Sequence, residues 1–135
     1  MPDPVVYIDR SRIRPGKVAE LRRGVEELAR FIEGREPQLL FYGFDIDDAA
    51  ERMTVLAVHP DPESLEYHMD VGAAAFRKLG DCLDLESIEV FGETTGRTRE
   101  QLDAKARDLG ERGRVRVASL HAGFSRLTAV APTPS

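Results

Sequence analysis

The chain has 135 residues, of which 41% are hydrophobic and 32% are charged, and its formal net charge is −5. This length suits one domain with a single core, and the composition is that of a globular protein rather than a disordered one. The acidic balance, with no block of five or more basic residues, argues against binding of nucleic acid. No segment approaches the ~20 apolar residues of a membrane span, and the first residues lack the pattern of a secretion signal. A single cysteine, Cys82, cannot form an intrachain disulfide, so we expect a cytoplasmic protein.

The first strand and the first helix are predicted by two different hydrophobic spacings. Residues 5–13, VVYIDRSRI, begin with β-branched and aromatic residues and end at the turn sequence Arg14-Pro15-Gly16. Over residues 17–33 the apolar side chains recur every three or four positions, as they do on one face of a helix. These side chains are Val18, Leu21, Val25, Leu28 and Ile32, and Gly34 is placed to end the helix.

A hairpin, a second helix and a fourth strand follow. Residues 38–46 and 52–59 flank the polar turn DDAAE and are predicted to pair antiparallel. Residues 65–79 return to helical spacing, with Gly72 as a place where the helix would kink, and residues 84–92 alternate like a strand. The order β-α-β-β-α-β predicts an α+β fold, the ferredoxin-like sandwich, in which two helices cover one face of an antiparallel sheet.

The remaining residues are predicted to extend this domain. We place the ferredoxin-like domain at residues 1–95 and a C-terminal extension at residues 96–135. Thr98 and Gln101 have capping-box spacing at the start of a short helix that ends before Gly110. An edge strand is predicted at residues 114–120, and the last residues, TAVAPTPS, are predicted to be a frayed end.

Both faces of the predicted sheet carry apolar side chains. Tyr42 and Phe44 share one face of the second strand with Leu40, whereas Phe41 lies on the other face. The third strand likewise has Leu56 and Val58 on the face opposite Met53, Val55 and Ala57. Two helices cover only one face, and burial of a large apolar side chain is worth roughly 1.5–3 kcal/mol. We therefore expect a homodimer in which a second copy covers the other face; the alternative is a monomer whose C-terminal tail covers it.

The segment HPDPESLEYHMDVGAAAF, residues 59–76, joins the third strand to the second helix. Together with Arg14-Pro15-Gly16-Lys17, the spacing from Leu65 to His68 and the strand LESIEVFGE, it resembles the antibiotic biosynthesis monooxygenase family of dimeric α+β barrels. The resemblance covers roughly residues 3–93. It implies a homodimer with a cavity between helices and sheet in each subunit. In characterised members this cavity oxidises polycyclic aromatic phenols or quinols with O₂ and without metal or flavin.

Several residues are candidates for such a reaction. His68 matches the family's helix histidine and is the first candidate for a catalytic base, since the ordinary pKa of histidine is about 6.5. Tyr42 is the second catalytic candidate, as a donor to a bound oxygen. His59 precedes Pro60 and is either a substrate-binding residue or a turn residue. The other candidates for substrate binding are an arginine for an anionic oxygen and apolar side chains for a cavity wall: Arg10, Phe41, Phe44, Met53, Phe76 and Phe91.

The predicted function is a cofactor-independent monooxygenase acting on a planar aromatic phenol or quinol. We expect no metal or cofactor, because HxxxH, HExxH, CxxC, GxGxxG, GxxxxGK[ST] and GxSxG are absent from the sequence. One alternative is a non-catalytic dimeric barrel that binds a small ligand or serves as an accessory subunit. It is favoured because the GAAA stretch stands where the family often has a second histidine. Another alternative, haem binding, is disfavoured by the lack of tryptophan.

Overall fold

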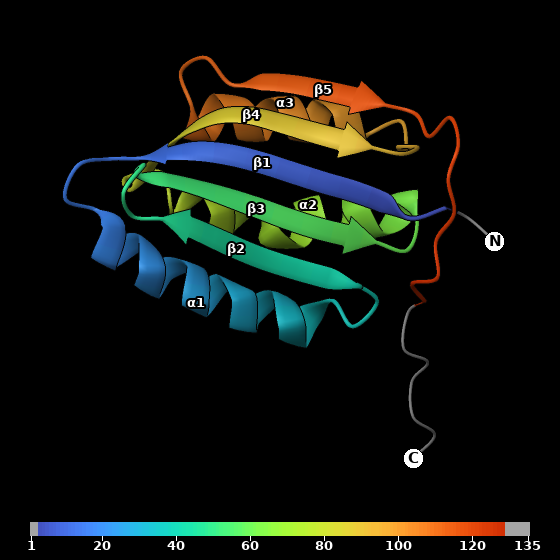
Figure 1. The fold of residues 1–135 in the computed structure, drawn as a ribbon, viewed down its shortest axis with the longest axis horizontal. Helices are drawn as coiled ribbons and strands as arrows, with labels where there is room; N and C mark the ends of the chain where they lie inside the picture. The colour runs from blue at the N-terminus through green and yellow to red at the C-terminus, as the bar shows by residue number, and fades with distance from the viewer. Residues whose placement is uncertain (1–2, 129–135) are drawn as a thin grey trace.

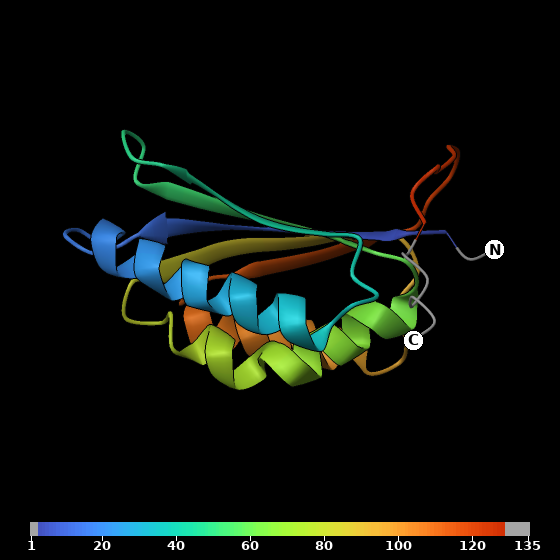
Figure 2. The same ribbon diagram turned by 90° about the horizontal axis from the view of Figure 1, so that it is seen from below.

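The computed structural model describes residues 3–128, which form a five-stranded sheet with helices on one side only (Figures 1 and 2). Within these residues no helix combines the length and the apolar character needed to cross a bilayer. The elements in chain order are β1 (Val5–Ile13), α1 (Val18–Arg35), β2 (Phe41–Asp47), β3 (Arg52–His59), α2 (Pro62–Arg77), β4 (Leu83–Phe91), α3 (Thr98–Leu109) and β5 (Arg114–Ala118).

The sheet has the strand order β2-β3-β1-β4-β5. The first four strands pair antiparallel, whereas β5 runs parallel to β4. This arrangement confirms the predicted α+β, ferredoxin-like fold with a helix and a strand added at the C-terminal end. The sheet is open, with β2 and β5 at its edges, so a closed barrel is not formed by one chain.

The helices lie where the hydrophobic spacing predicts them. α1 turns Leu21, Val25, Leu28 and Ile32 toward the sheet, and all four are buried. Asp61 caps the N-terminus of α2: its carboxylate accepts a hydrogen bond from the backbone N–H of Ser64 at 2.8 Å. It continues unbroken through Gly72, where a kink was expected.

α3 is a third helix in the layer that covers the sheet, where the predicted sandwich has only two helices. It packs beside α2 and against β4, on the same side of the sheet as α1 (Figure 2). Its buried side chains include Leu102, Ala106 and Leu109, which follow helical spacing. The C-terminal extension therefore contributes to the core instead of lying outside it.

β4 departs from the regular alternation predicted for it. Its register against β1 shifts between Arg10 and Ser11, because β4 holds one extra residue at that point. As a result Leu85 and Ile88 both face the helices. Strict alternation over residues 84–92 would place Leu85 and Phe91 on one face, but Phe91 lies on the opposite face, 43% exposed.

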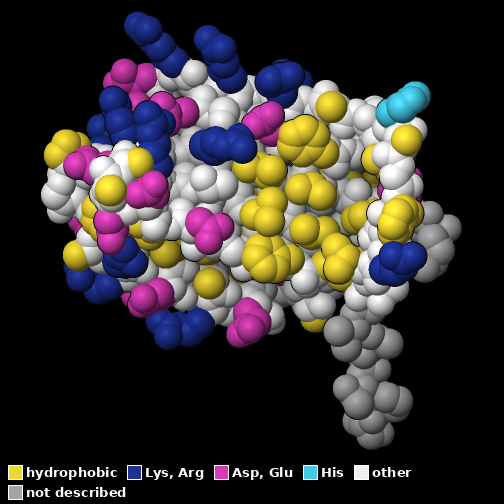
Figure 3. Space-filling view, in the orientation of Figure 1, with side chains coloured by type: hydrophobic (Ala, Val, Ile, Leu, Met, Phe, Trp, Pro, Cys, Tyr) yellow, Lys and Arg dark blue, Asp and Glu magenta, His cyan; other side chains and the backbone are white. Residues whose placement is uncertain are grey.

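The face of the sheet away from the helices is apolar at its centre, as predicted. The strand register places Phe41, Val58, Val6 and Phe91 in one row across four strands. We call this surface the outer patch; it consists of Val6, Ile8, Phe41, Leu56, Val58 and Phe91. Figure 3 shows apolar side chains gathered over the sheet, with charged side chains around them.

The C-terminal tail does not bury the outer patch within the described residues. Residues 119–128 run past one end of the strands (Figure 1). Their apolar side chains stay in solvent, since Phe124 is 80% and Leu127 is 60% exposed, and Phe41 in the patch is 51% exposed. Residues 119–128 therefore do not cover the outer patch, in contrast to the alternative of a monomer whose C-terminal tail covers it. The frayed end predicted for residues 129–135 lies outside the described residues.

Gly72 provides a test of the packing under α2. A Cβ atom there would lie 2.3 Å from Cζ of Phe76, so we expect Gly72→Ala to lower the free energy of unfolding by roughly 1–3 kcal/mol, a typical cost of overpacking. Gly34→Ala in α1 is the control, because nothing lies within 4 Å of its Cβ position. We expect that change to stabilise by up to about 1 kcal/mol. Urea denaturation measures both variants, and a Gly72→Ala protein as stable as Gly34→Ala would contradict this packing.

Candidate active site

A group of polar side chains lies inside the core, between the helices and the inner face of the sheet. Strand alternation directs Tyr7 and Asp9 of β1 inward, where they are 0% and 3% exposed. We call the group the inner polar cluster; its members are Tyr7, Asp9, Glu36, Tyr42, His59, His68 and Lys105. Buried polar groups cost free energy unless they are hydrogen-bonded or paired, so the contacts of each member decide what it does.

His68 and Glu36 form a buried pair. Nδ1 of His68 lies 2.7 Å from Oε2 of Glu36, and the two side chains are 1% and 0% exposed. Burial lowers the pKa of His68 to about 3, with a smaller effect of the Lys105 charge, and burial raises the pKa of Glu36 to about 7. The imidazole is therefore uncharged near neutral pH. When Glu36 is ionised, its carboxylate accepts the hydrogen bond from Nδ1–H of His68, and Nε2 is then the ring nitrogen that can take a proton from another molecule.

His59 lies beside this pair and is fully buried, so it is not an exposed turn residue. Its Nδ1 is 2.7 Å from Oγ of Ser64, and its ring centroid is 5.3 Å from that of His68. Burial, with the neighbouring His68, lowers the pKa of His59 to about 3. Its Nε2 is buried and has no hydrogen-bond partner within residues 3–128. A polar ligand atom or a water molecule would satisfy this nitrogen.

Lys105 reaches the same region from α3. Nζ donates to the hydroxyl oxygen of Tyr7 at 2.7 Å and to Oδ2 of Asp9 at 3.1 Å. The Tyr7 hydroxyl in turn donates to Oδ2 of Asp9 at 2.5 Å. Burial, followed by the Asp9 charge, raises the pKa of Tyr7 well above its ordinary value, so the phenol stays protonated. Lysine and aspartate thus form a neutral pair at the centre of the sheet.

Aromatic rings connect the two parts of the cluster. Tyr42 lies edge-on to His68 with ring centroids 5.1 Å apart, and burial raises the pKa of its hydroxyl well above the ordinary value. The Phe76 centroid is 5.3 Å from that of His68 and 4.0 Å from Nζ of Lys105. The Phe76 ring therefore contacts both the histidine and the ammonium group.

Three spaces adjoin the cluster. A small space of about 20 Å³ lies among Asp9, Ser11, Tyr42 and Lys105, with Phe44 and Met53 also in its wall, and it has room for about one water molecule. A pocket of about 140 Å³ lies between α2 and α3. A wider opening of about 410 Å³ lies between α1 and β2, where Glu36 and Tyr42 form part of its wall. The cluster can thus be approached from two sides.

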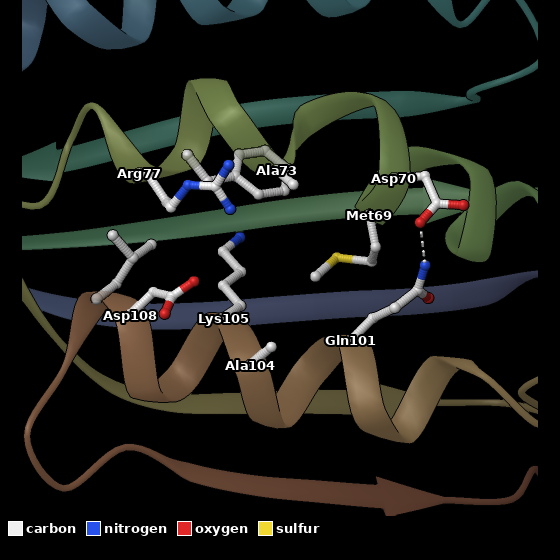
Figure 4. A pocket seen from close by; sticks show the side chains of 10 residues that line it. Met69, Asp70, Ala73, Arg77, Gln101, Ala104, Lys105 and Asp108 are labelled. Carbon is white, nitrogen blue, oxygen red and sulfur yellow. Dashed lines mark hydrogen bonds between the residues drawn. The ribbon is translucent and has the colours of Figure 1, made fainter.

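The pocket between α2 and α3 meets the small space at Phe76, Lys105 and Leu109, which line both. Figure 4 shows Lys105 extending from α3 between the two helices, with the small side chains of Ala73 and Ala104 beside it. One end is bordered by Asp70 and Gln101, which are joined by a 2.8 Å hydrogen bond, and the other by Arg77 and Asp108.

The structure brings together some of the predicted site residues and separates others. His68, Tyr42 and His59 meet on the helix side, and three of the expected wall residues also lie there: Phe44, Met53 and Phe76. Arg10, Phe41 and Phe91 lie on the opposite face of the sheet, because strand alternation and the β4 bulge turn them away from the helices. There Arg10 forms an ion pair with Glu89 rather than facing the cluster.

Sequence reasoning did not single out Asp9, Glu36 or Lys105. The sequence could have indicated that Asp9 is buried, since it stands at an inward position of β1 between Tyr7 and Ser11. Nothing in the sequence indicated burial of Lys105, because a lysine on a charged helix is ordinarily a surface residue. Among residues 3–128, no three His, Cys, Asp or Glu side chains are arranged to hold a metal ion.

The sequence matches no protein-family model and no curated protein, but its structure matches solved structures. MupZ from Pseudomonas fluorescens aligns with a TM-score of 0.69 and 19% identity over 93% of this chain and 91% of its own. A Caulobacter crescentus CB15 protein named "putative antibiotic biosynthesis monooxygenase" aligns with a TM-score of 0.59 and 21% identity over 66% of this chain and 88% of its own. SnoaB from Streptomyces nogalater, named a cofactor-independent oxygenase, aligns with a TM-score of 0.57 and 16% identity over 69% of this chain and 95% of its own. The fold is that of the antibiotic biosynthesis monooxygenase-like proteins.

The matched structures differ in how much of this chain they cover. The 93% coverage by MupZ is too large to leave out both α3 and β5, so part of the C-terminal extension has a counterpart there. The alignments with SnoaB and the Caulobacter protein leave about a third of this chain unmatched, although they cover 95% and 88% of those two proteins.

The buried histidines predict a pH dependence of stability. The pKa of His59 is lowered from 6.5 to about 3 on folding, so its stabilising contribution is present above pH 6.5 and is lost as the pH falls toward 3. We expect the free energy of unfolding of the wild type to fall relative to that of His59→Gln by up to about 1.4 kcal/mol per pH unit between about pH 6 and pH 4.

Glu36 also makes the free energy of unfolding depend on pH, in the direction opposite to His59. Because Glu36 is present in both the wild type and His59→Gln, its contribution cancels in the difference between the two proteins. The raised pKa of Glu36 adds stability below pH 4.5, and this is lost as the pH rises through about 7. Urea denaturation of both proteins at each pH gives the difference. Parallel pH profiles for the two proteins would contradict an uncharged, buried His59.

Proposed function

We propose that the protein is a cofactor-independent monooxygenase that oxidises a planar aromatic phenol or quinol between its helices and its sheet. The observation that carries this proposal is the buried, uncharged His68, with Nδ1 held by Glu36 and aromatic rings beside it. An uncharged imidazole can accept a proton, and aromatic side chains suit a planar ring. The shared fold with SnoaB, an oxygenase without cofactor, supports the same reaction class.

The chemistry begins with removal of a proton. Nε2 of His68 accepts the proton of the substrate hydroxyl, and the hydroxyl of Tyr42 donates a hydrogen bond to the oxygen that becomes negative. The carboxylate of Glu36, 2.7 Å from Nδ1, stabilises the imidazolium that forms. The electron-rich anion of the substrate is then able to transfer electrons to O₂.

The oxidation balances without an added reductant. For an anthrone-type substrate, a CH₂ group loses its two hydrogens and gains one oxygen atom to become C=O, which is a four-electron oxidation. O₂ accepts the four electrons: one of its atoms becomes the carbonyl oxygen, and the other leaves as water with the two hydrogens. The protein contributes a base, a hydrogen-bond donor and an enclosed apolar site, and no metal or flavin enters these steps.

O₂ uptake with 1,8-dihydroxyanthrone tests this function. We expect His68→Gln to lower kcat by roughly 100-fold or more, because loss of a positioned general base commonly costs that much. His121→Gln is the matched control, since His121 is exposed and lies outside the inner polar cluster. An uptake rate equal to that in buffer, or equal rates for His68→Gln and the wild type, would count against the proposal.

The alanines after Gly72 favour a second candidate function, binding of a small ligand without turnover. Ala73 lies in the wall of the pocket between α2 and α3, where a larger side chain would fill space. The stretch in which related proteins often have a second histidine thus leaves room for a ligand here. Binding of the anthrone with no O₂ uptake would favour this second candidate.

We further propose that the protein acts as a homodimer joined through the outer patch. The patch contains six apolar residues on a face that no helix or described tail residue covers. An isologous pairing of two such faces would remove them from water. The two sheets would then enclose the barrel from which this fold takes its name.

The dimer is tested by a charge at the centre of the patch. We expect Leu56→Asp to convert a species of twice the chain mass into a monomer, because a buried carboxylate without a partner opposes association. Ala50→Asp, in the exposed turn between β2 and β3, is the control and should stay dimeric. Size-exclusion chromatography with light scattering measures both, and a monomeric wild type would refute the dimer.

A further inference from the structure

Lys105 is placed to do more than neutralise Asp9. Its side chain is only 10% exposed, although it comes from a helix whose outer surface faces solvent. An ammonium group has three N–H donors, and within the described residues two of them are used, by Tyr7 and Asp9. A buried ammonium group with one N–H donor not used by a described residue can bind a negatively charged oxygen.

The surroundings of Lys105 also indicate where such an oxygen would lie. Lys105 borders both the small space next to Asp9 and Ser11 and the pocket between α2 and α3. Ser11 lines the same small space, and its Oγ is buried without a hydrogen-bond partner in residues 3–128. Two polar groups of different elements thus face one small space, and one of them lacks a partner.

Phe76 shows that an aromatic ring fits between the base and the cation. Its ring centroid lies 5.3 Å from that of His68 and 4.0 Å from Nζ of Lys105. The same side chain lies between the small space and the pocket between α2 and α3, since it lines both. For the ring of a ligand to contact both His68 and Lys105, the Phe76 side chain has to turn away from its present position.

We propose that Lys105 binds the ionised oxygen of a weakly acidic phenol, which enters between α2 and α3 as the neutral molecule. This deepens the proposed function and rests on it for the role of His68. The phenolic O–H bond breaks, its proton passes to Nε2 of His68, and the electron pair stays on the oxygen that Nζ binds. Phenolate then pairs with Lys105 and imidazolium with Glu36, so the net charge of the site does not change.

The same charge balance determines the class of substrate. Lys105 and Asp9 already neutralise each other, so a carboxylate ligand would add an unpaired negative charge to the core, which is costly. A neutral phenol or enol adds no charge on entry and becomes anionic only by a proton transfer within the site. The site therefore selects weakly acidic hydroxyls on aromatic or enolic ligands over carboxylic acids.

The proposal is tested with 4-nitrophenol, whose phenolate absorbs visible light whereas the neutral phenol does not. Titration of the bound probe under nitrogen gives its apparent pKa without any oxidation. We expect the wild type to lower that pKa by about one unit or more, a tenfold preference for phenolate, and Lys105→Met to lose this effect. Lys105→Arg should retain most of it, because the charge is kept.

Lys78→Met is the control for loss of a surface charge, because Lys78 ends α2 on the side facing α1. It should leave the pKa of the bound probe unchanged. Circular dichroism checks folding, and Lys105→Gln replaces Lys105→Met should that variant not fold. An unshifted probe pKa in the wild type, or an equal shift in a folded neutral variant, would overturn the proposal. Neither result depends on O₂ uptake. A failure of the proposed phenolate binding by Lys105 can therefore be told apart from a failure of the proposed monooxygenase function.

The entry route is tested by filling each opening in turn. Ala104→Met narrows the pocket between α2 and α3, and Ala29→Met narrows the opening between α1 and β2. We expect the first change to slow association of 4-nitrophenol at least tenfold and the second to leave it within twofold, as measured by stopped-flow absorbance. The reverse pattern would refute entry between α2 and α3.

Discussion

The carboxylate of Asp9 is the constraint on which the arrangement of the core depends. β1 is the central strand, paired on both sides, so its inward positions lie as far from solvent as any in the molecule. An ionised carboxylate at such a position is tolerated only with a counter-charge and donors close to it. Lys105 and Tyr7 supply both, which makes α3 a structural requirement of the sheet it covers.

The two halves of the inner polar cluster reach electrostatic balance in different ways. Asp9 and Lys105 are both charged and cancel each other, whereas burial shifts the pKa values of Glu36 and His68 toward the uncharged forms. Lys105 also disfavours a proton on His68, and Asp9 favours one, so the two halves influence each other through their charges. A charge introduced in one half therefore changes the electrostatic environment of the titratable groups in the other half.

The elements of the fold were predictable because they depend on local periodicity. The apolar stripe of α1 and the alternation of β1 and β3 record directly which side of each element is buried. The bulge in β4 was not predictable, since one extra residue opposite Arg10 changes the face of every later side chain without altering the local composition. This is why Phe91 was expected in a cavity wall and lies on the outer face. Lys105 was missed for a related reason: its burial depends on Asp9, which is 96 residues away in the sequence.

The open sheet has a further consequence for how copies of the chain can meet. Both edge strands carry exposed charges, with Arg114 and Arg116 on β5 and Asp45 and Asp47 on β2. Charged side chains on an edge strand disfavour the addition of another strand, which would otherwise extend the sheet from molecule to molecule into fibres. The chain thus discourages open-ended growth along its backbone edges, while its apolar outer patch stays uncovered by any described residue.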